Sequence, residues 1–174
     1  MNVVVLSDTH RSEGTGLDGR AAAAVADADV ILHAGDFTTT AVLDAFHGLD
    51  ARLSAVHGNR DTAGVRDRLP SARTVALGDV TVAMTHRKRG GETALALLGR
   101  ERGADLVVSG HTHRPAVAGA DPVLLNPGSH DAPRGGPRSH AELTVDDGLS
   151  GTIRTVDGEI LREVDVPAPD ESGE

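Results

Sequence analysis

The 174-residue chain has no cysteine, tyrosine or tryptophan, and it has only two phenylalanines. Without cysteine there are no disulfides and no thiolate metal ligands, so any metal must be bound by carboxylate, amide or imidazole groups. With so few aromatic side chains, the core must consist of Val, Leu, Ile and Ala. No run of 18 apolar residues occurs, so the sequence predicts no membrane-spanning helix. An apolar strand begins at the second residue and leaves no room for a signal peptide. We therefore expect a cytoplasmic protein.

Lysine is nearly absent too, because Lys88 is the single lysine among 17 basic residues. The formal net charge is −9, which argues against broad nucleic-acid binding, since such proteins usually carry a basic face. The acidic, lysine-poor and arginine-rich composition favours a halophilic protein adapted to salt, with codon bias in a GC-rich genome as the alternative. A chain that is 39% hydrophobic is long enough for one domain. We expect this domain over residues 1–166 and an acidic flexible tail over residues 167–174.

Five short apolar runs each end in residues that can bind a metal. Each run has the β-branched residues and length typical of a buried strand. The central run, residues 30–34, ends at Gly35-Asp36; the others end at Asp8-Thr9-His10, Asn59, His86 and His111-Thr112-His113. If these strands lie side by side in one sheet, seven donors meet along one edge. The pattern predicts a metal site, and one that holds two metals.

The order of the segments indicates a mixed α/β protein. Apolar residues at helical spacing predict a helix over 17–28, and Thr38 to Thr40 offer N-cap hydroxyls for a second helix. Alternation of these helices with three strands implies parallel strands with right-handed crossovers, whose carboxyl ends bind ligands. A polar loop ending near Pro70 follows, then a hairpin over 74–85, a helix around 94–98 and a strand from 106. Three more strands, 142–145, 151–156 and 159–166, predict an antiparallel meander.

Taken together, the motifs Asp8-x-His10, Gly35-Asp36, Gly58-Asn59, His86 and Gly110-His111-x-His113 resemble the calcineurin-like metallophosphoesterase superfamily. The short chain and the loop Asn126-Pro127-Gly128-Ser129 are more specifically similar to its small prokaryotic phosphodiesterases, and hence to the metallophosphoesterase-fold subunit of the eukaryotic retromer coat. The resemblance implies two packed mixed β-sheets flanked by helices, a four-layer α-β-β-α sandwich.

The same resemblance implies a dinuclear enzyme that hydrolyses phosphodiester or small phosphoester bonds by attack of a metal-bridging hydroxide. Asp36 would bridge the two metals. One metal would be bound by Asp8, His10, Asp36 and His113, and the other by Asp36, Asn59, His86 and His111. Nitrogen and oxygen ligands suit two divalent transition ions, with manganese favoured and iron, zinc, nickel or cobalt as alternatives.

An arginine follows a candidate ligand in four loops, at Arg11, Arg60, Arg87 and Arg114. On an acidic protein this local reversal of charge suits phosphate, which guanidinium binds through two hydrogen bonds. Arg60 stands where many family members have a histidine that protonates the leaving group. From the resemblance as a whole we expect catalysis to depend on Asp36, Asn59, Arg60 and His111. The alternative is that these arginines point into solvent.

The remaining histidines have several interpretations. His130 follows the Asn-Pro-Gly-Ser loop and is a candidate substrate contact. His33 and His57 lie just before candidate ligands and either orient them or are buried strand residues. His47 and His140 are expected to be structural.

Two other functions compete with the enzyme. A docking scaffold of the retromer-subunit type would not need seven metal donors, and a nuclease would need a basic stripe and stacking aromatics. The sequence leaves open the substrate, the native metal and whether the chain forms a homodimer.

Overall fold

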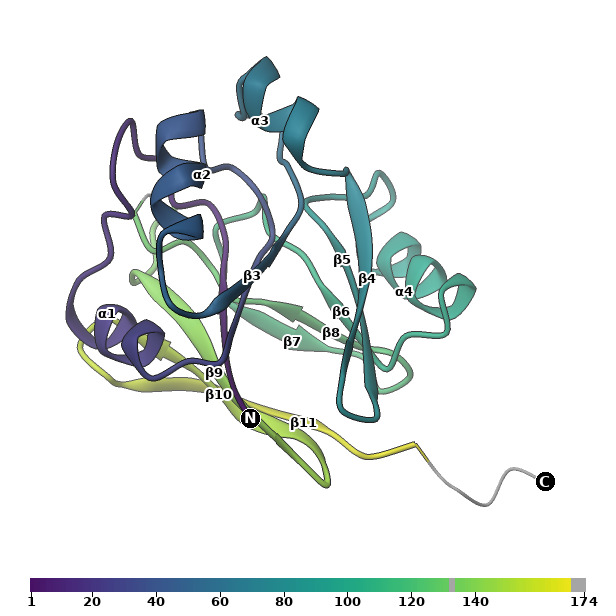
Figure 1. The fold of residues 1–174 in the computed structure, drawn as a ribbon. Coiled ribbons are helices and arrows are strands. Elements are labelled where there is room, and N and C mark those ends of the chain that lie inside the picture. Colours follow the sequence, from purple (N-terminus) through teal and green to yellow (C-terminus); the bar gives the residue numbers. More distant parts are fainter. Residues whose placement is uncertain (132–133, 170–174) are drawn as a thin grey trace.

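Two β-sheets form the centre of the computed structural model, which describes residues 1–131 and 134–169 (Figure 1). The six-stranded sheet has the order β11-β10-β9-β1-β2-β3, and the five-stranded sheet has the order β4-β5-β6-β8-β7. The first sheet consists of β1 (Asn2–Leu6), β2 (Val30–His33), β3 (Arg52–Ala55), β9 (Ser139–Asp146), β10 (Gly148–Thr155) and β11 (Ile160–Val166). The second consists of β4 (Ala72–Leu77), β5 (Val80–Thr85), β6 (Leu106–Val108), β7 (Ala116–Ala118) and β8 (Val123–Asn126).

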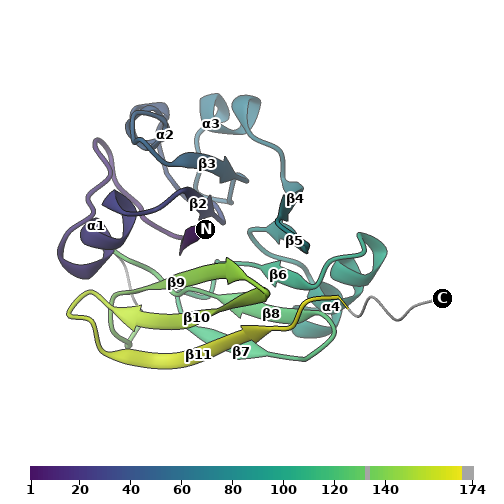
Figure 2. The same cartoon turned by 60° about the horizontal axis from the view of Figure 1, so that its bottom comes forward.

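Both sheets are mixed. In the first, β1, β2 and β3 pair in parallel, while β9, β10 and β11 form the antiparallel meander. In the second, β4 and β5 form an antiparallel hairpin, β5, β6 and β8 are parallel, and β7 runs antiparallel at the edge. The turned view shows the meander beside β7 and β8 of the other sheet (Figure 2). Parallel strands therefore end at the same side of both sheets, where ligand sites of α/β proteins lie.

Helices cover the outer face of each sheet. The helices are α1 (Gly19–Ala26), α2 (Thr40–His47), α3 (Ala63–Arg68) and α4 (Gly91–Glu101). α1, α2 and α3 contribute to an apolar cluster with the first sheet, while α4 packs on the second (Figure 1). The layers are therefore α-β-β-α. Within the described residues no helix has the length and hydrophobicity needed to span a membrane.

Alternating strand residues build the layers. In β1, Val3 and Val5 belong to the cluster between the sheets, whereas Val4 and Leu6 face the helices. The same two-residue period recurs in β6, where Leu106 and Val108 face the other sheet and Val107 faces α4. Strands buried on both faces are apolar throughout, as the sequence pattern predicts.

The structure confirms the four-layer sandwich of two mixed sheets and corrects three local expectations. The five apolar runs do not share one sheet, since three lie in the first and those ending at His86 and His111 lie in the second. The polar loop before Pro70 contains α3, which is too short to show a helical period. The helix expected over 17–28 spans only Gly19–Ala26. Of the expected acidic tail, residues 170–174 lie outside the described part of the chain.

Candidate metal centre

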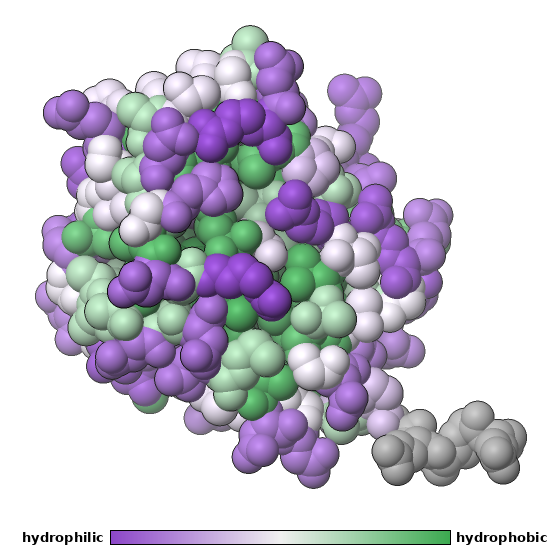
Figure 3. Space-filling view, in the orientation of Figure 1, coloured by the Kyte–Doolittle hydropathy of each residue, from purple (hydrophilic) through white to green (hydrophobic). Residues whose placement is uncertain are grey.

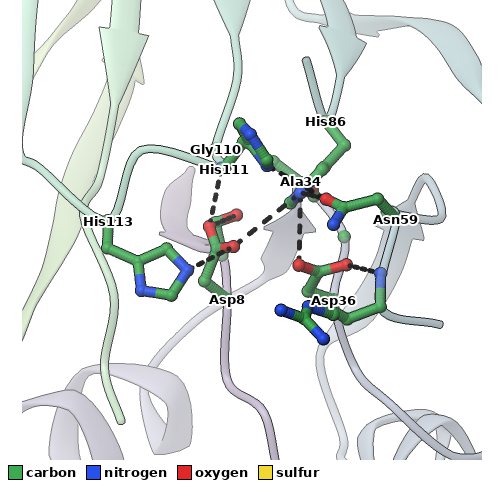
Figure 4. A network of polar contacts seen from close by, with 12 residues as sticks. Asp8, Ala34, Asp36, Asn59, His86, Gly110, His111 and His113 are labelled. Carbon is green, nitrogen blue, oxygen red and sulfur yellow. Dashed lines mark hydrogen bonds and ion pairs between the residues drawn. The ribbon is translucent and has the colours of Figure 1, made fainter. Parts of the chain in front are cut away.

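The seven candidate ligands come together where the strands of the two sheets end, and Figure 4 labels all of them except His10. Asp8 and His10 follow β1, Asp36 follows β2 and Asn59 follows β3, all in the first sheet. From the second sheet, the loops after β5 and β6 contribute the rest of the set, namely His86, His111 and His113. The cluster therefore lies between the sheets.

Asp8, His10 and His113 form a first group. The Nε2 atoms of His10 and His113 lie 3.2 Å apart, and they lie 3.5 and 3.1 Å from Asp8 Oδ1. Asp36 Oδ2 lies 3.6 Å from His10 Nε2. Ring nitrogens and carboxylate oxygens thus converge on a small volume, as they do around a cation.

A second group contains Asp8, Asp36 and His86. His86 Nε2 lies 3.3 Å from Asp36 Oδ2 and 3.8 Å from Asp8 Oδ1. Asn59 Oδ1 lies 3.0 Å from both His86 Nε2 and His111 Nδ1. Asp36 thus contacts one histidine of each group, and Asp8 is a member of both groups.

The donor atoms fit divalent cations. Asp8 Oδ1 is a buried carboxylate oxygen that accepts no hydrogen bond, although three imidazole nitrogens surround it. The other oxygen, Oδ2, accepts hydrogen bonds from the Ser7 hydroxyl and the His111 N–H at 2.6 and 2.9 Å. A buried charged oxygen without a donor is costly unless a cation pairs with it. The unsatisfied oxygen is the one that faces the other candidate ligands.

The electric field of the site favours positive charge. Burial acts to raise the pKa of Asp8, but its contacts with His10, His86 and Ser7 lower it to about 2. The pKa of Asp36 is also lowered, against its burial, chiefly by His86. The pKa of His86 is raised, because the nearby carboxylates outweigh its burial. Burial lowers the pKa of His111, with His86 and Arg87 adding to the effect. Both carboxylates are therefore ionised at neutral pH.

Strained backbone is concentrated at this centre. Among the described residues, six that are not glycine have a positive φ, and five of them are candidate ligands: Asp8, His10, Asp36, His111 and His113, with Thr38 the sixth. A positive φ costs about 1–3 kcal/mol in a residue with a side chain and persists only where the surrounding structure imposes it. Such strain typically marks a functional site.

Asp61 holds together the ligand loops that follow β2 and β3. None of the sequence motifs includes this residue. Its Oδ2 accepts the N–H groups of Asp36 and Gly58 at 3.0 and 2.7 Å, and its Oδ1 accepts the N–H of Thr38 at 2.7 Å. The side chain is 5% exposed. Asp61 lies three residues after Gly58, in the loop that follows β3. Aspartate is a common residue in turns, and its place after a strand end is the signal that the sequence offers.

His33 links the ligand loops that follow β1 and β2. Its Nδ1 accepts the N–H of Gly35 at 3.1 Å, so a neutral ring carries its hydrogen on Nε2. That nitrogen lies 3.1 Å from the hydroxyl of Thr9, between two candidate ligands, and can donate to it. His33 thus orients ligand loops, which was one of its two predicted interpretations.

Several neighbours fix individual ligands. His86 Nδ1 lies 2.7 Å from the carbonyl oxygen of Ala34, which can only accept, so Nδ1 carries a hydrogen and Nε2 is the nitrogen that faces the other candidate ligands. Asn126 donates to the carbonyl oxygen of Gly110, and the Ser129 hydroxyl donates to that of Asp8. The Asn-Pro-Gly-Ser loop thus supports two ligand segments.

The four arginines differ in position. Arg60 lines an open cavity of about 590 Å³ together with His10 and His113, and its backbone N–H donates to Asp36 Oδ1 at 2.8 Å. Arg87 lies beside His86 at the wall of two other cavities. Arg11 pairs with Asp131 at 2.7 Å. Arg114 is exposed.

The other histidines lie apart from the candidate ligands. The ring of His130 lies 2.9 Å from Arg138 and 3.4 Å from Asp18, because the loop after Ser129 turns it toward α1. Its expected contact with substrate is therefore not supported by this position. His140 is buried against Glu142, and His47 ends α2 at the surface. The half-buried His57 donates its backbone N–H to the carbonyl oxygen of Pro70.

The fold is an α/β sandwich, and the cluster of donors between its sheets is a candidate metal centre. The calcineurin-like phosphoesterase superfamily domain matches residues 1–148, and the chain belongs to that family.

Three proteins are similar to this chain in sequence or in fold. A probable metallophosphoesterase of Methanocaldococcus jannaschii is 35% identical over 159 residues, which are 88% of this chain and 80% of that protein. The Escherichia coli phosphoesterase Yfce has a TM-score of 0.73 at 23% identity, covering 95% of this chain and 100% of that one. Vps29 of Entamoeba histolytica, described as complexed with zinc, has a TM-score of 0.76 at 22% identity, covering 95% and 99%.

Proposed function

We propose that the protein is a metal-dependent phosphoesterase that hydrolyses phosphodiester or small phosphoester bonds, within one domain over residues 1–166. The observation that carries the proposal is the buried, strained cluster of carboxylate and imidazole donors around an unsatisfied oxygen of Asp8. The name of the archaeal relative and the match to the family model support the same class of reaction.

We assign two divalent metals to the centre. Asp8, His10, Asp36 and His113 would bind one, and Asp36, Asn59, His86 and His111 would bind the other, with manganese as our first choice and zinc, iron, nickel or cobalt as alternatives. When bound, such ions supply Lewis-acid polarisation of the phosphoryl group and lower the pKa of water. The contacts of Asp36 Oδ2 with His10 and His86 support Asp36 as the shared ligand.

The protein's own groups position the substrate and stabilise its charge. Arg60 lines the cavity beside His10, where its guanidinium can pair with a phosphoryl oxygen. Arg87 stands beside His86 and can do the same from the other sheet. Guanidinium groups act as hydrogen-bond donors to anions, so both arginines can stabilise negative charge as it develops.

A docking scaffold is the second candidate, favoured by the structural likeness to Vps29. Docking surfaces usually present a large continuous apolar patch. Among the described residues, the exposed large hydrophobic side chains are Met1 before β1, Leu97 in α4 and Ile160 in β11. On the face seen in Figure 3, hydrophobic residues lie in patches separated by hydrophilic side chains. We therefore favour the enzyme.

Metal content tests the proposal directly. After dialysis against manganese and removal of free metal, elemental analysis should find two ions per chain, and the loaded protein should hydrolyse nitrophenyl phosphodiesters. Asp36→Asn should lose both metals and the activity, whereas His111→Ala should lose mainly one metal. Asp44→Asn, at an exposed aspartate paired with Arg68, is the matched control. Two bound metals without hydrolysis across a panel of esters would favour the scaffold, and no bound metal would contradict the centre itself.

A further inference from the structure

A second cavity adjoins the candidate metal centre on the side of the second sheet. It has a volume of about 200 Å³ and lies between α4 and the ends of β5, β6 and β8. His86 and His111 both form part of its wall. Because these two histidines belong to both the candidate centre and the cavity wall, a substrate whose phosphoryl group lies at the centre can place a substituent in this cavity.

Most of the lining of this cavity is apolar. Leu95 of α4, Ala116 and Ala118 of β7, and Leu124 of β8 form one wall, whereas Ser109, Thr112 and Asn126 are the polar uncharged residues of the lining. A polar substituent placed against the apolar wall would lose its hydrogen bonds to water without replacement. An apolar substituent would instead gain free energy from leaving water.

The mouth of the cavity carries an excess of positive charge. Arg87 and Lys88 lie there with a single acid, Glu92, among the lining residues. A phosphodiester keeps one negative charge beside its substituents, so an apolar group attached to an anion matches both the wall and the mouth.

The volume limits what can enter. An apolar cavity of about 150 Å³ suffices for benzene, so about 200 Å³ accommodates one aromatic ring or a short branched alkyl group. A nucleoside is larger than this volume.

We propose that this cavity binds an aryl or short branched alkyl substituent of a phosphoester whose phosphoryl group lies at the metal centre. The inference rests on the proposed function, because it takes the phosphoryl position from that site. It makes the apolar wall, through Leu95, Ala116 and Ala118, a determinant of substrate specificity.

Phosphonates test the cavity by binding alone. Calorimetry on the manganese-loaded protein should show phenylphosphonate binding about tenfold more tightly than methylphosphonate, because only the phenyl ring fills the cavity. Ala116→Leu, at an exposed position of an edge strand, should abolish this preference by filling the space. Ala23→Leu, at an exposed position of α1, is the matched control and should retain it.

A second variant guards against misfolding of the first. Leu95→Ala should enlarge the cavity and shift the preference toward naphthylphosphonate. In a parallel assay, Ala116→Leu should raise KM for a diaryl phosphodiester and leave kcat within about twofold. Equal binding of the phenyl and methyl compounds, no binding of either, or a preference unchanged in Ala116→Leu would overturn the inference. A preference for phenyl without hydrolysis would support the cavity and contradict the proposed enzyme, so the two failures are distinguishable.

Discussion

Individual side chains in this site are held by contacts that leave one reactive atom free. Ser7 and the backbone of His111 occupy one oxygen of Asp8, and Ala34 fixes the ring of His86. Asp61 gathers the N–H groups of two ligand loops. These neighbours orient the donors before a metal arrives, which reduces the free energy needed to order them on binding.

Arg60 should determine which leaving groups the enzyme tolerates. An arginine side chain does not give up a proton in proteins, so it cannot act as a general acid. Esters with acidic leaving groups, such as nitrophenyl phosphodiesters, should therefore react far faster than alkyl esters. Arg60→Ala should lower turnover about tenfold through lost charge stabilisation, and Arg60→His should restore part of the rate for alkyl esters. The measurement is turnover against leaving-group pKa for each variant.

The backbone N–H of Arg60 that bonds to Asp36 is retained in both variants. Arg89→Ala is the control and should have little effect. It removes the same charge at an exposed position three residues after His86. A wild-type rate independent of leaving-group pKa, with chemistry rate-limiting, would mean that another residue donates the proton.

His33 should make the stability of the protein sensitive to acid. Complete burial lowers the pKa of His33 from 6.5 to about 3, so the folded protein keeps the ring neutral while the unfolded chain protonates it. The unfolded state binds the extra proton between these two values, and stability falls as the pH drops below 6.5, by about 1.4 kcal/mol per pH unit for this group. Urea unfolding of the metal-free protein at pH 7.5, 6.5 and 5.5 measures the slope.

The His33→Asn protein should be less stable at pH 7.5. Its free energy of unfolding should also change less with pH, because the slope contributed by the protonation of one group is removed. His47→Asn, at the exposed end of α2, should keep the wild-type slope. Equal slopes in all three proteins would show that His33 does not cause the acid sensitivity.

At the scale of the elements, strands and loops have opposite roles. The strands that precede the candidate ligands are mostly apolar and buried, and they provide a rigid frame. The loops that follow them contain the positive φ values and the hydrogen bonds to buried polar groups. Strain concentrated in loops is stable here because packed strands fix both ends of each loop.

Thr38 offers a test of that strain. This residue has φ 92°, which is unfavourable for a β-branched side chain, and its buried hydroxyl has no hydrogen-bond partner. Thr38→Gly should raise the free energy of unfolding by about 1 kcal/mol, because relief of strain exceeds the entropy cost of glycine. Thr62→Gly, at φ −66° before α3, should be neutral or slightly destabilising. Chemical denaturation of both variants decides, and a destabilised Thr38→Gly would show that this loop stores no strain.

At the scale of the whole molecule, the acidic surface contrasts with the arginines near the site. The net charge is −9, and Arg60 and Arg87 lie beside candidate ligands. The contrast attracts anions to the cavity while the rest of the surface repels polyanions such as nucleic acids.

Salt should stabilise the protein if its composition reflects salt adaptation. Surface carboxylates repel one another at low ionic strength, and dissolved ions screen that repulsion. Tm should therefore rise by about 5 °C or more between dilute buffer and 2 M potassium chloride. Calorimetry of the metal-free protein across this range gives the answer. A constant Tm would leave codon bias as the explanation of the composition.

The sequence by itself determined the donors, the strands and the family. Apolar runs of four to six residues define buried strands, and polar residues directly after them must emerge at the strand ends. Because parallel strands end on one side of a sheet, Asp8, Asp36 and Asn59 could be placed near one another from order alone. Their spacing, with that of the histidines, carried the resemblance that the family match confirmed.

Only the tertiary structure decided which strands share a sheet, because pairing depends on residues far apart in the chain. β1 pairs with β9 from the other end of the sequence. The strands before His86 and His111 belong to the second sheet, so the donors meet between the two sheets. Packing, and no local pattern, turned His130 toward Arg138 and Asp18. It also imposed positive φ on five candidate ligands and left the apolar cavity beside His86 and His111. Strain and empty volume arise from contacts across the whole fold, so no local stretch of sequence can encode them.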